Sequence, residues 1–304
     1  TVTLYLLTAA NEAPIARNMD LSTYKNVAIT GYFDAVDSEG DTLTFQLMDT
    51  PARGAVTLAE DGSAKFVYTP YENKTGKDSF IYVAIDSAGN TSSEAKVTIQ
   101  INKPDTKVTY ADMEGDPAHK ASIRLAEEGI FVGSYLNGEY FFDPDRPVTR
   151  AEFLTMAMAT VGMAPLEDVT TTGFTDDAAI PTWAKAYAAA GVADGIVQGT
   201  STAEGVAFRG DSPITFNEAA TVLNRLLDVE DVDLAAWYAD RETVPSWAAQ
   251  AVGNLEAVNV LAAGSFGSDS LDTTVTRADA AQMLSAARTL LEQEDDGGLF
   301  GWLS

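Results

Sequence analysis

The chain has 304 residues, enough for two or three ordinary domains, and carries 45 acidic against 19 basic residues, a formal net charge of −26. This charge argues against nucleic acid and anionic lipid as partners, because phosphate groups are bound by clustered lysine and arginine. With no cysteine and one histidine, His119, thiol chemistry and Cys/His metal sites are excluded. No segment approaches the ~20 apolar residues that cross a bilayer, so we expect no membrane insertion.

The first ten residues contain an apolar segment, 1–8, that reads as a strand. It precedes a loop, Asn11-Glu-Ala-Pro14, that is typical of a domain start. We interpret residues 1–10 as an N-terminal strand or as the end of a preceding domain. Such a strand either pairs within its own chain or completes the sheet of another subunit.

Residues 11–103 have the pattern of a β-sandwich. Apolar and polar residues alternate in five segments, which we expect to be strands: 27–29, 43–47, 66–68, 80–83 and 97–101. Clusters of Asp, Glu, Gly and Ser separate these segments at the spacing of sandwich turns. The Lys-Pro-Asp stretch at 103–105 is then a linker.

Beyond residue 104 the apolar period becomes helical. We expect six helices in three pairs, over residues 118–128, 151–161, 183–193, 217–227, 247–258 and 277–291. Internal repetition explains the pairs, because Asp112, Asp176 and Asp240 are 64 residues apart each time. The predicted repeats are 104–163, 164–228 and 229–291. Residues 292–304 form an acidic tail with an apolar tip, which either is a flexible spacer or packs on its own domain.

Each repeat also carries a threonine three residues before an acid, the spacing of a capping box. The pairs are Thr149 with Glu152, Thr215 with Glu218, and Thr276 with Asp279. Arg150 and Arg277 then occupy the first helical position. A guanidinium there, beside the positive end of the helix dipole, is able to bind a carboxylate through two hydrogen bonds. The alternative is that both arginines pair with nearby acids.

Trp183 and Trp247 occupy equivalent positions in the second and third repeats. Each either presents a flat face to a sugar ring or packs in the core. We interpret Asp112, Asp176 and Asp240 as cap or turn residues that orient a groove.

These elements resemble the S-layer homology family. The residues that carry the resemblance are Tyr110-Ala-Asp112, Phe142-Asp-Pro144 and Pro147-Val-Thr-Arg-Ala-Glu-Phe153 in the first repeat, Phe174-Thr-Asp176, Trp183-Ala-Lys185 and Pro213-Ile-Thr215 in the second, and Tyr238-Ala-Asp240, Trp247-Ala248 and Val275-Thr-Arg-Ala-Asp279 in the third. In that family three repeats form one pseudo-threefold body, a pseudo-trimer, whose grooves bind secondary cell-wall polysaccharide, often through a pyruvylated sugar.

The resemblance therefore implies a multidomain chain, an all-β sandwich followed by a mainly α three-repeat unit. It implies a polysaccharide site formed by Arg150, Arg277, Trp183, Trp247, Asp112, Asp176, Asp240 and Glu152. Three departures put some grooves in doubt: Phe216 replaces the arginine of the second repeat, Pro117 fills the tryptophan position of the first, and Asn259-Val260 replaces Gly-Ile in the third. We expect one or two working sites.

The β domain resembles the immunoglobulin/cadherin-like repeats of bacterial surface proteins over residues 11–102. The resemblance lies in Asn11-Glu-Ala-Pro14 and in segments 35–45 and 85–90. Loops that contain Asp37, Glu39, Asp41 and Asp86 suit Ca²⁺, which binds six to eight oxygens. The alternative is that these acids belong to ordinary solvated turns.

The sequence thus predicts a non-catalytic, extracellular protein of the bacterial cell surface, held to the cell wall or S-layer by its repeats and displaying the β domain outward. A second hypothesis is a structural subunit that self-associates into an S-layer or filament through the β domain and residues 1–8. An enzyme that uses paired carboxylates is a third, with no spacing motif behind it.

Overall fold

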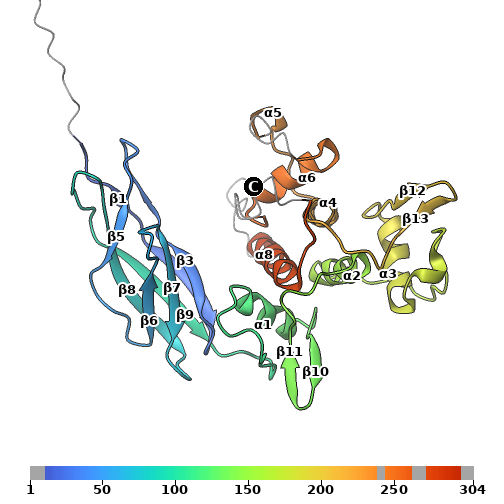
Figure 1. Cartoon of the computed structure of the whole chain (residues 1–304), viewed down its shortest axis with the longest axis horizontal. Coiled ribbons are helices and arrows are strands. Elements are labelled where there is room, and N and C mark those ends of the chain that lie inside the picture. The colour runs from blue at the N-terminus through green and yellow to red at the C-terminus, as the bar shows by residue number, and fades with distance from the viewer. Residues whose placement is uncertain (1–10, 238–243, 262–271, 296–304) are drawn as a thin grey trace, which may run out of the picture. The chain divides into compact units, whose positions relative to one another are not determined.

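A computed structural model describes residues 11–237, 244–261 and 272–295 (Figure 1). The chain divides into two compact units, one of residues 1–107 and 114–120 and the other of residues 108–113 and 121–304. The first is rich in strands and the second in helices, as the sequence predicts. The predictions for residues 1–8, for Asp240 and for the apolar tip fall outside the described residues.

The first unit contains two sheets. One consists, in spatial order, of β2 (Met19–Tyr24), β9 (Ala95–Asn102), β8 (Gly76–Ile85) and β5 (Thr44–Leu47), with β2 parallel to β9 and the other neighbours antiparallel. The other consists of β3 (Ile29–Tyr32), β7 (Lys65–Pro70) and β6 (Gly54–Leu58), all antiparallel. The two-residue strands β1 (Ile15–Ala16) and β4 (Ala35–Val36) pair separately. Four of the five predicted strands correspond to β5, β7, β8 and β9, whereas the predicted strand 27–29 shares only Ile29 with β3. Strands β1, β2, β4 and β6 were not predicted.

Aromatic side chains form the centre of this unit. Alternation along β7 and β8 buries Phe66, Tyr68, Phe80 and Tyr82 completely. The ring of Phe33 stacks between them, with its centroid 4.5 Å from that of Phe66 and 4.3 Å from that of Tyr82. Burial of this apolar surface stabilises the unit without disulfides.

The second unit is built on three pairs of helices. The pairs are α1 (His119–Glu127) with α2 (Arg150–Thr160), α3 (Thr182–Ala193) with α4 (Phe216–Leu227), and α6 (Ser246–Ala257) with α8 (Arg277–Asp295). The first two residues of α1 are assigned to the first unit. Every predicted helix is confirmed to within one residue at each end, except that α8 continues four residues further.

Shorter elements connect these helices. The hairpin β10 (Ser134–Leu136) with β11 (Glu139–Phe141) joins α1 to α2, and β12 (Thr200–Thr202) with β13 (Gly205–Ala207) joins α3 to α4. A 3₁₀ turn, η1 (Asp177–Ala179), precedes α3, and α5 (Leu234–Trp237) precedes α6. None of these elements was predicted. No helix within the described residues is long and apolar enough to cross a membrane.

The predicted capping boxes start α2, α4 and α8. Thr149 Oγ1 accepts a hydrogen bond from Glu152 N at 3.2 Å, and Glu152 Oε2 accepts one from Thr149 N at 3.0 Å. The same reciprocal pair occurs between Thr215 and Glu218 and between Thr276 and Asp279. These bonds satisfy backbone donors at each helix start, where no intrahelical partner exists.

The residues just before the three capping threonines hydrogen-bond in a closed ring. Val148 N donates to Val275 O at 2.9 Å, Val275 N to Ile214 O at 2.8 Å, and Ile214 N to Val148 O at 3.0 Å. All three side chains are buried. Each predicted repeat therefore donates to one of the other two and accepts from the other, which joins three segments distant in sequence at one point of the core.

Candidate functional site

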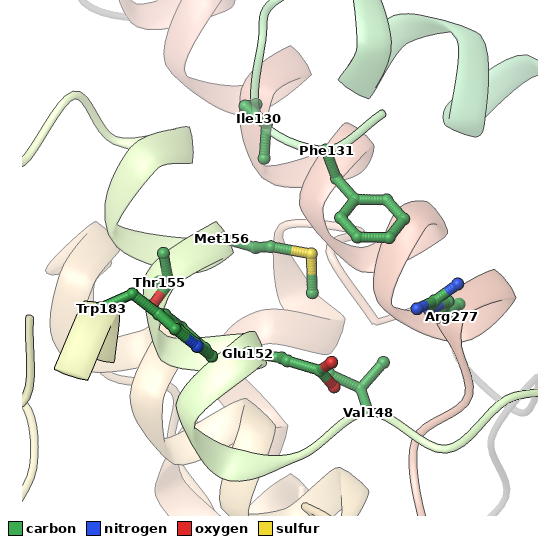
Figure 2. Close-up of a pocket in the computed structure, with 8 residues that line it drawn as sticks. All are labelled: Ile130, Phe131, Val148, Glu152, Thr155, Met156, Trp183 and Arg277. Atoms are coloured by element: carbon green, nitrogen blue, oxygen red, sulfur yellow. The ribbon is translucent and has the colours of Figure 1, made fainter. Parts of the chain in front are cut away.

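A pocket of about 210 Å³ opens where α2, α3 and α8 converge (Figure 2). Three predicted site residues line it, one from each of the three helices: Glu152, Trp183 and Arg277. The remaining lining residues are mostly apolar: Ile130, Phe131, Val148, Thr155 and Met156. The pocket thus combines a charged edge with an apolar floor and an aromatic side chain.

Arg277, the first residue of α8, is fixed by contacts of one guanidinium nitrogen, Nη1. Only 7% of its side chain is exposed, and Nη1 donates to Phe142 O at 2.8 Å and to Asp143 Oδ2 at 3.0 Å. The guanidinium lies 5.0 Å from the centroid of the Phe131 ring. Burial, with a further contribution from the charge of Arg146, lowers the pKa of Arg277. In the part of the chain that the structure describes, Nε and Nη2 make no hydrogen bond, so donors remain for the pocket.

Arg150, the first residue of α2, has the corresponding contacts in the second repeat. Nε donates to Phe208 O at 3.1 Å, and Nη1 lies 2.7 Å from Glu218 Oε1, with 14% of the side chain exposed. Pairing with nearby acids, the alternative left open by the sequence, is therefore present at Arg150 and at Arg277. A role of either arginine in ligand binding stays a prediction.

Asp112 and Asp176 position the loops that hold these arginines. Asp112 accepts hydrogen bonds from Phe142 N at 2.9 Å and Asp143 N at 2.7 Å. Asp176 accepts them from Phe208 N at 2.8 Å and Arg209 N at 2.7 Å. Both residues lie in turns, but each carboxylate bonds to a loop 30 to 33 residues further along the chain, and Asp176 makes no cap bond to the turn that follows it. Because neither lines the pocket, their effect on a ligand passes through the loop.

The two tryptophans are exposed at the first turns of α3 and α6. Trp183 is 52% exposed and Trp247 is 58% exposed. The core-packing alternative is therefore wrong for both side chains. Trp183 also lines the pocket.

Arg146, which the sequence analysis missed, lies beside the same pocket. Its side chain is 52% exposed, and Nη2 is 3.4 Å from Glu152 Oε1. Arg277 N donates to Arg146 O at 2.9 Å, so the two arginines are neighbours although they come from different repeats. The available signal was a lone basic residue three positions before the capping threonine, Thr149.

Three of the four predicted metal ligands meet at one end of the first unit. Ligand oxygens of Asp37, Asp41 and Asp86 lie within 4.8 Å of one another. Asp37 Oδ2 is buried and has no hydrogen-bond partner among the residues that the structure describes. Asn11 Nδ2 donates to Asp41 Oδ2 at 3.2 Å and to Asp86 Oδ2 at 3.1 Å.

The carboxylates of Asp86 and Glu39 accept hydrogen bonds from nearby groups. Burial opposes ionisation of Asp86, but hydrogen bonds from Asn90 and from the backbone of Ala88 and Gly89 outweigh it and lower the pKa of Asp86. Glu39 lies outside the three-residue cluster, and its Oε2 accepts bonds from Ser38 Oγ and Glu12 N.

A strand-rich unit followed by a helical unit of linked repeats is a modular architecture. Family models identify both parts: residues 11–100 match the bacterial Ig domain, and residues 173–220 match the S-layer homology domain. The second match includes Asp176, Trp183 and Glu218. Both matched domains are non-catalytic, and the S-layer homology domain indicates a protein of the cell surface that is anchored to the cell wall.

Solved structures give only weak likenesses. An endo-fucoidan hydrolase of glycoside hydrolase family 107 is 22% identical, over 32% of this chain and 14% of that one, with a TM-score of 0.26. A variant of the SrpA adhesin from Streptococcus sanguinis is 17% identical (34% of this chain, 63% of that one, TM-score 0.25), and titin domain M7 is 7% identical (31%, 99%, 0.21). The chain spans only 14% of the length of the hydrolase. No curated protein matches the chain.

Proposed function

We propose that the helical unit binds an acidic secondary cell-wall polysaccharide through a pyruvylated sugar, in grooves between its repeats. S-layer homology domains bind cell-wall polymers, and this binding anchors a protein to the cell wall. The observation that carries the finer proposal is the pocket that brings Glu152, Trp183 and Arg277 together from the three repeats. We further propose that the chain acts by binding and display, without catalysis.

The lining of the pocket fits the chemistry of a pyruvyl ketal. Such a group joins a carboxylate and a methyl group to a sugar ring. The positive charge at this edge of the pocket suits the carboxylate, because charge-assisted bonds to guanidinium are strong and directional. Phe131 and Met156 provide apolar surface for the methyl group, and the exposed face of Trp183 suits the ring.

The three repeats form one pseudo-threefold body in this proposal. The closed ring formed by Val148, Ile214 and Val275 supports it, since each repeat uses the same position toward the next. A second groove would use Arg150, Glu218 and Trp247. The third is impaired, because Phe216 replaces the arginine.

Co-sedimentation of the whole chain with purified cell walls tests the proposal. We expect the chain to sediment with native walls and to stay in solution with walls whose polysaccharide has been extracted or depyruvylated. Trp183→Ala should weaken sedimentation about five-fold or more, since stacking of a nucleobase on an aromatic side chain contributes roughly 1–3 kcal/mol and we expect a sugar ring to contribute comparably. Tyr135→Ala is the matched control, because Tyr135 is a 63% exposed aromatic outside the pocket. Equal sedimentation with depyruvylated walls would refute the pyruvyl assignment.

Self-assembly into an S-layer or filament is the second candidate function. Ile15 and Val36 face each other across the β1–β4 pair and are 63% and 43% exposed, an apolar surface at the edge of the first unit. Sedimentation velocity over a range of concentrations tests it. Ordered, concentration-dependent assembly that Ile15→Ser abolishes would support a lattice subunit, and a monomer at all concentrations would exclude it.

Calcium is the cation that we propose for the acidic cluster. Three carboxylates and the unpartnered oxygen of Asp37 match a hard ion that takes only oxygen ligands. Asp37, Asp41 and Asp86 would hold it, with the side-chain oxygen of Asn11 after an amide flip. Bound calcium would neutralise the mutual repulsion of the acids and tie the two loops together.

Calorimetric titration with Ca²⁺, and thermal unfolding with and without a chelator, test this site. We expect calcium to raise the midpoint of unfolding of the first unit, because a ligand that binds only the folded state stabilises it. Asp37→Asn should remove the effect. Asp61→Asn, which changes an acid of another turn in the same unit, should keep it, and no heat of binding in the unmodified chain would contradict the proposal.

A further inference from the structure

The loop that precedes α2 places one exposed arginine beside the Trp183 pocket. Arg146 is 52% exposed, and its single described ion pair, to Glu152, is 3.4 Å long. A long contact that is open to water is weak, so another carboxylate is able to replace it. Arg277 and Arg150 differ, because they are 7% and 14% exposed and each also donates to a backbone carbonyl.

Glu152 is the fixed partner of the pair. Its Oε2 accepts the Thr149 N–H in the capping box that starts α2, and this leaves Oε1 toward Arg146. The arginine is therefore the end that can move. The Arg146 side chain stays close to the pocket when it moves, because the Arg146 carbonyl oxygen accepts a hydrogen bond from Arg277 N at 2.9 Å.

The other repeats lack this arrangement. The positions three residues before their capping threonines are Ser212 and Thr273. In the second repeat the largely covered side chain of Arg150 pairs with the capping-box acid, Glu218, at 2.7 Å. An exposed arginine of that repeat, Arg209, stands instead where the first repeat has Asp143. Among the described residues, only the first repeat leaves its capping-box acid to an exchangeable arginine.

We propose that Arg146 determines the ligand specificity of the Trp183 groove. In this account Arg146 leaves Glu152 and binds the carboxylate of an acidic sugar whose ring lies on Trp183, while Arg277 stays bound to Phe142 and Asp143 and positions the loop. The inference rests on the proposed function, since it assigns to Arg146 the recognition of a charged ligand in the same groove. It also makes this groove, and not the one at Trp247, the site that distinguishes acidic from neutral sugars.

A pair of small ligands tests Arg146 directly. The probes are a monosaccharide with a pyruvyl ketal and its methyl ester, which has the same shape without the charge, titrated into the whole chain by calorimetry. We expect the unmodified chain to bind the acid about two- to five-fold more tightly than the ester, as for an ion pair that is open to water. Arg146→Ala should bind both probes equally, at the affinity of the ester. Arg146→Lys should restore part of the preference.

Arg209→Ala is the matched control, because it removes an exposed arginine from the corresponding loop of the second repeat. It should keep the full preference for the acid. The inference is overturned by an Arg146→Ala chain that keeps the preference, by one that loses affinity for both probes alike, which would indicate a structural role, or by an Arg209→Ala chain that loses the preference.

Co-sedimentation with purified walls separates this inference from the proposed function. If the unmodified chain sediments with walls but prefers neither probe, anchoring stands and the role of Arg146 is refuted. If the unmodified chain does not sediment with walls, the proposed function fails and the inference fails with it.

Discussion

Replacement of Arg277 by alanine should destabilise the helical unit by about 1.5–4 kcal/mol. The side chain is almost fully buried, and its removal leaves the carbonyl oxygen of Phe142, itself a buried residue, without its 2.8 Å donor. An unsatisfied buried acceptor costs about 1–3 kcal/mol. Loss of the guanidinium from the Phe131 ring, 5.0 Å away, adds about 0.5–1 kcal/mol.

The ion pair itself should contribute little to that loss. Asp143 leaves 47% of its side chain exposed, so water solvates its carboxylate once the arginine is gone. Asp143→Asn, the matched variant, should therefore cost less than about 1 kcal/mol. The two variants together separate the backbone hydrogen bond from the salt bridge.

Urea unfolding followed by circular dichroism at the helical band measures both variants, because the helices belong mainly to the second unit. The reasoning requires Arg277→Ala to shift the midpoint far more than Asp143→Asn. Equal shifts would place the energy in the ion pair, and a shift below about 0.5 kcal/mol for Arg277→Ala would refute the burial argument.

Three further predictions address other parts of the molecule. Thr215→Ala removes the cap of α4 and should lower the free energy of unfolding by about 1 kcal/mol in the same urea assay. A change near zero would mean that the capping box of Thr215 and Glu218 does not stabilise the helix. Gly31→Ala places a Cβ 2.3 Å from the Phe66 ring and should lower the thermal midpoint of the strand-rich unit by the equivalent of about 1–3 kcal/mol; an unchanged midpoint would contradict the close packing. Hydrogen bonds from Lys185 and Thr172 lower the pKa of Asp177 to about 2. Because this folded-state pKa lies below the unfolded value of 3.8, the stabilisation is complete above about pH 4 and is lost as the pH falls toward 2. Lys185→Met should flatten the dependence of the urea midpoint on pH in that interval, and an unaltered slope would assign the effect to another group.

Local sequence signals predicted the helical unit more completely than the sandwich. The starts of α2, α4 and α8 follow from a threonine and an acid three residues apart, and the structure contains all three reciprocal hydrogen-bond pairs. Strand β2 was missed because one of its inward positions is polar. Thr23 is buried there, and its hydroxyl donates to Val27 O at 2.7 Å, a partner that alternation of apolar residues does not reveal.

The sequence by itself determined the order of the two units, the helix starts, the internal repetition and the residue types of the site, because these depend on periodicity and on contacts within four residues. Only the tertiary structure decided how the site residues are used. Arg277 finds its acceptor on Phe142, 135 residues away, and Trp183 is left exposed where it lines a pocket with Glu152. Partners so distant in the chain are set by which surfaces pack together, so no local pattern distinguishes a buried, engaged arginine from one such as Arg146 that remains available to a ligand.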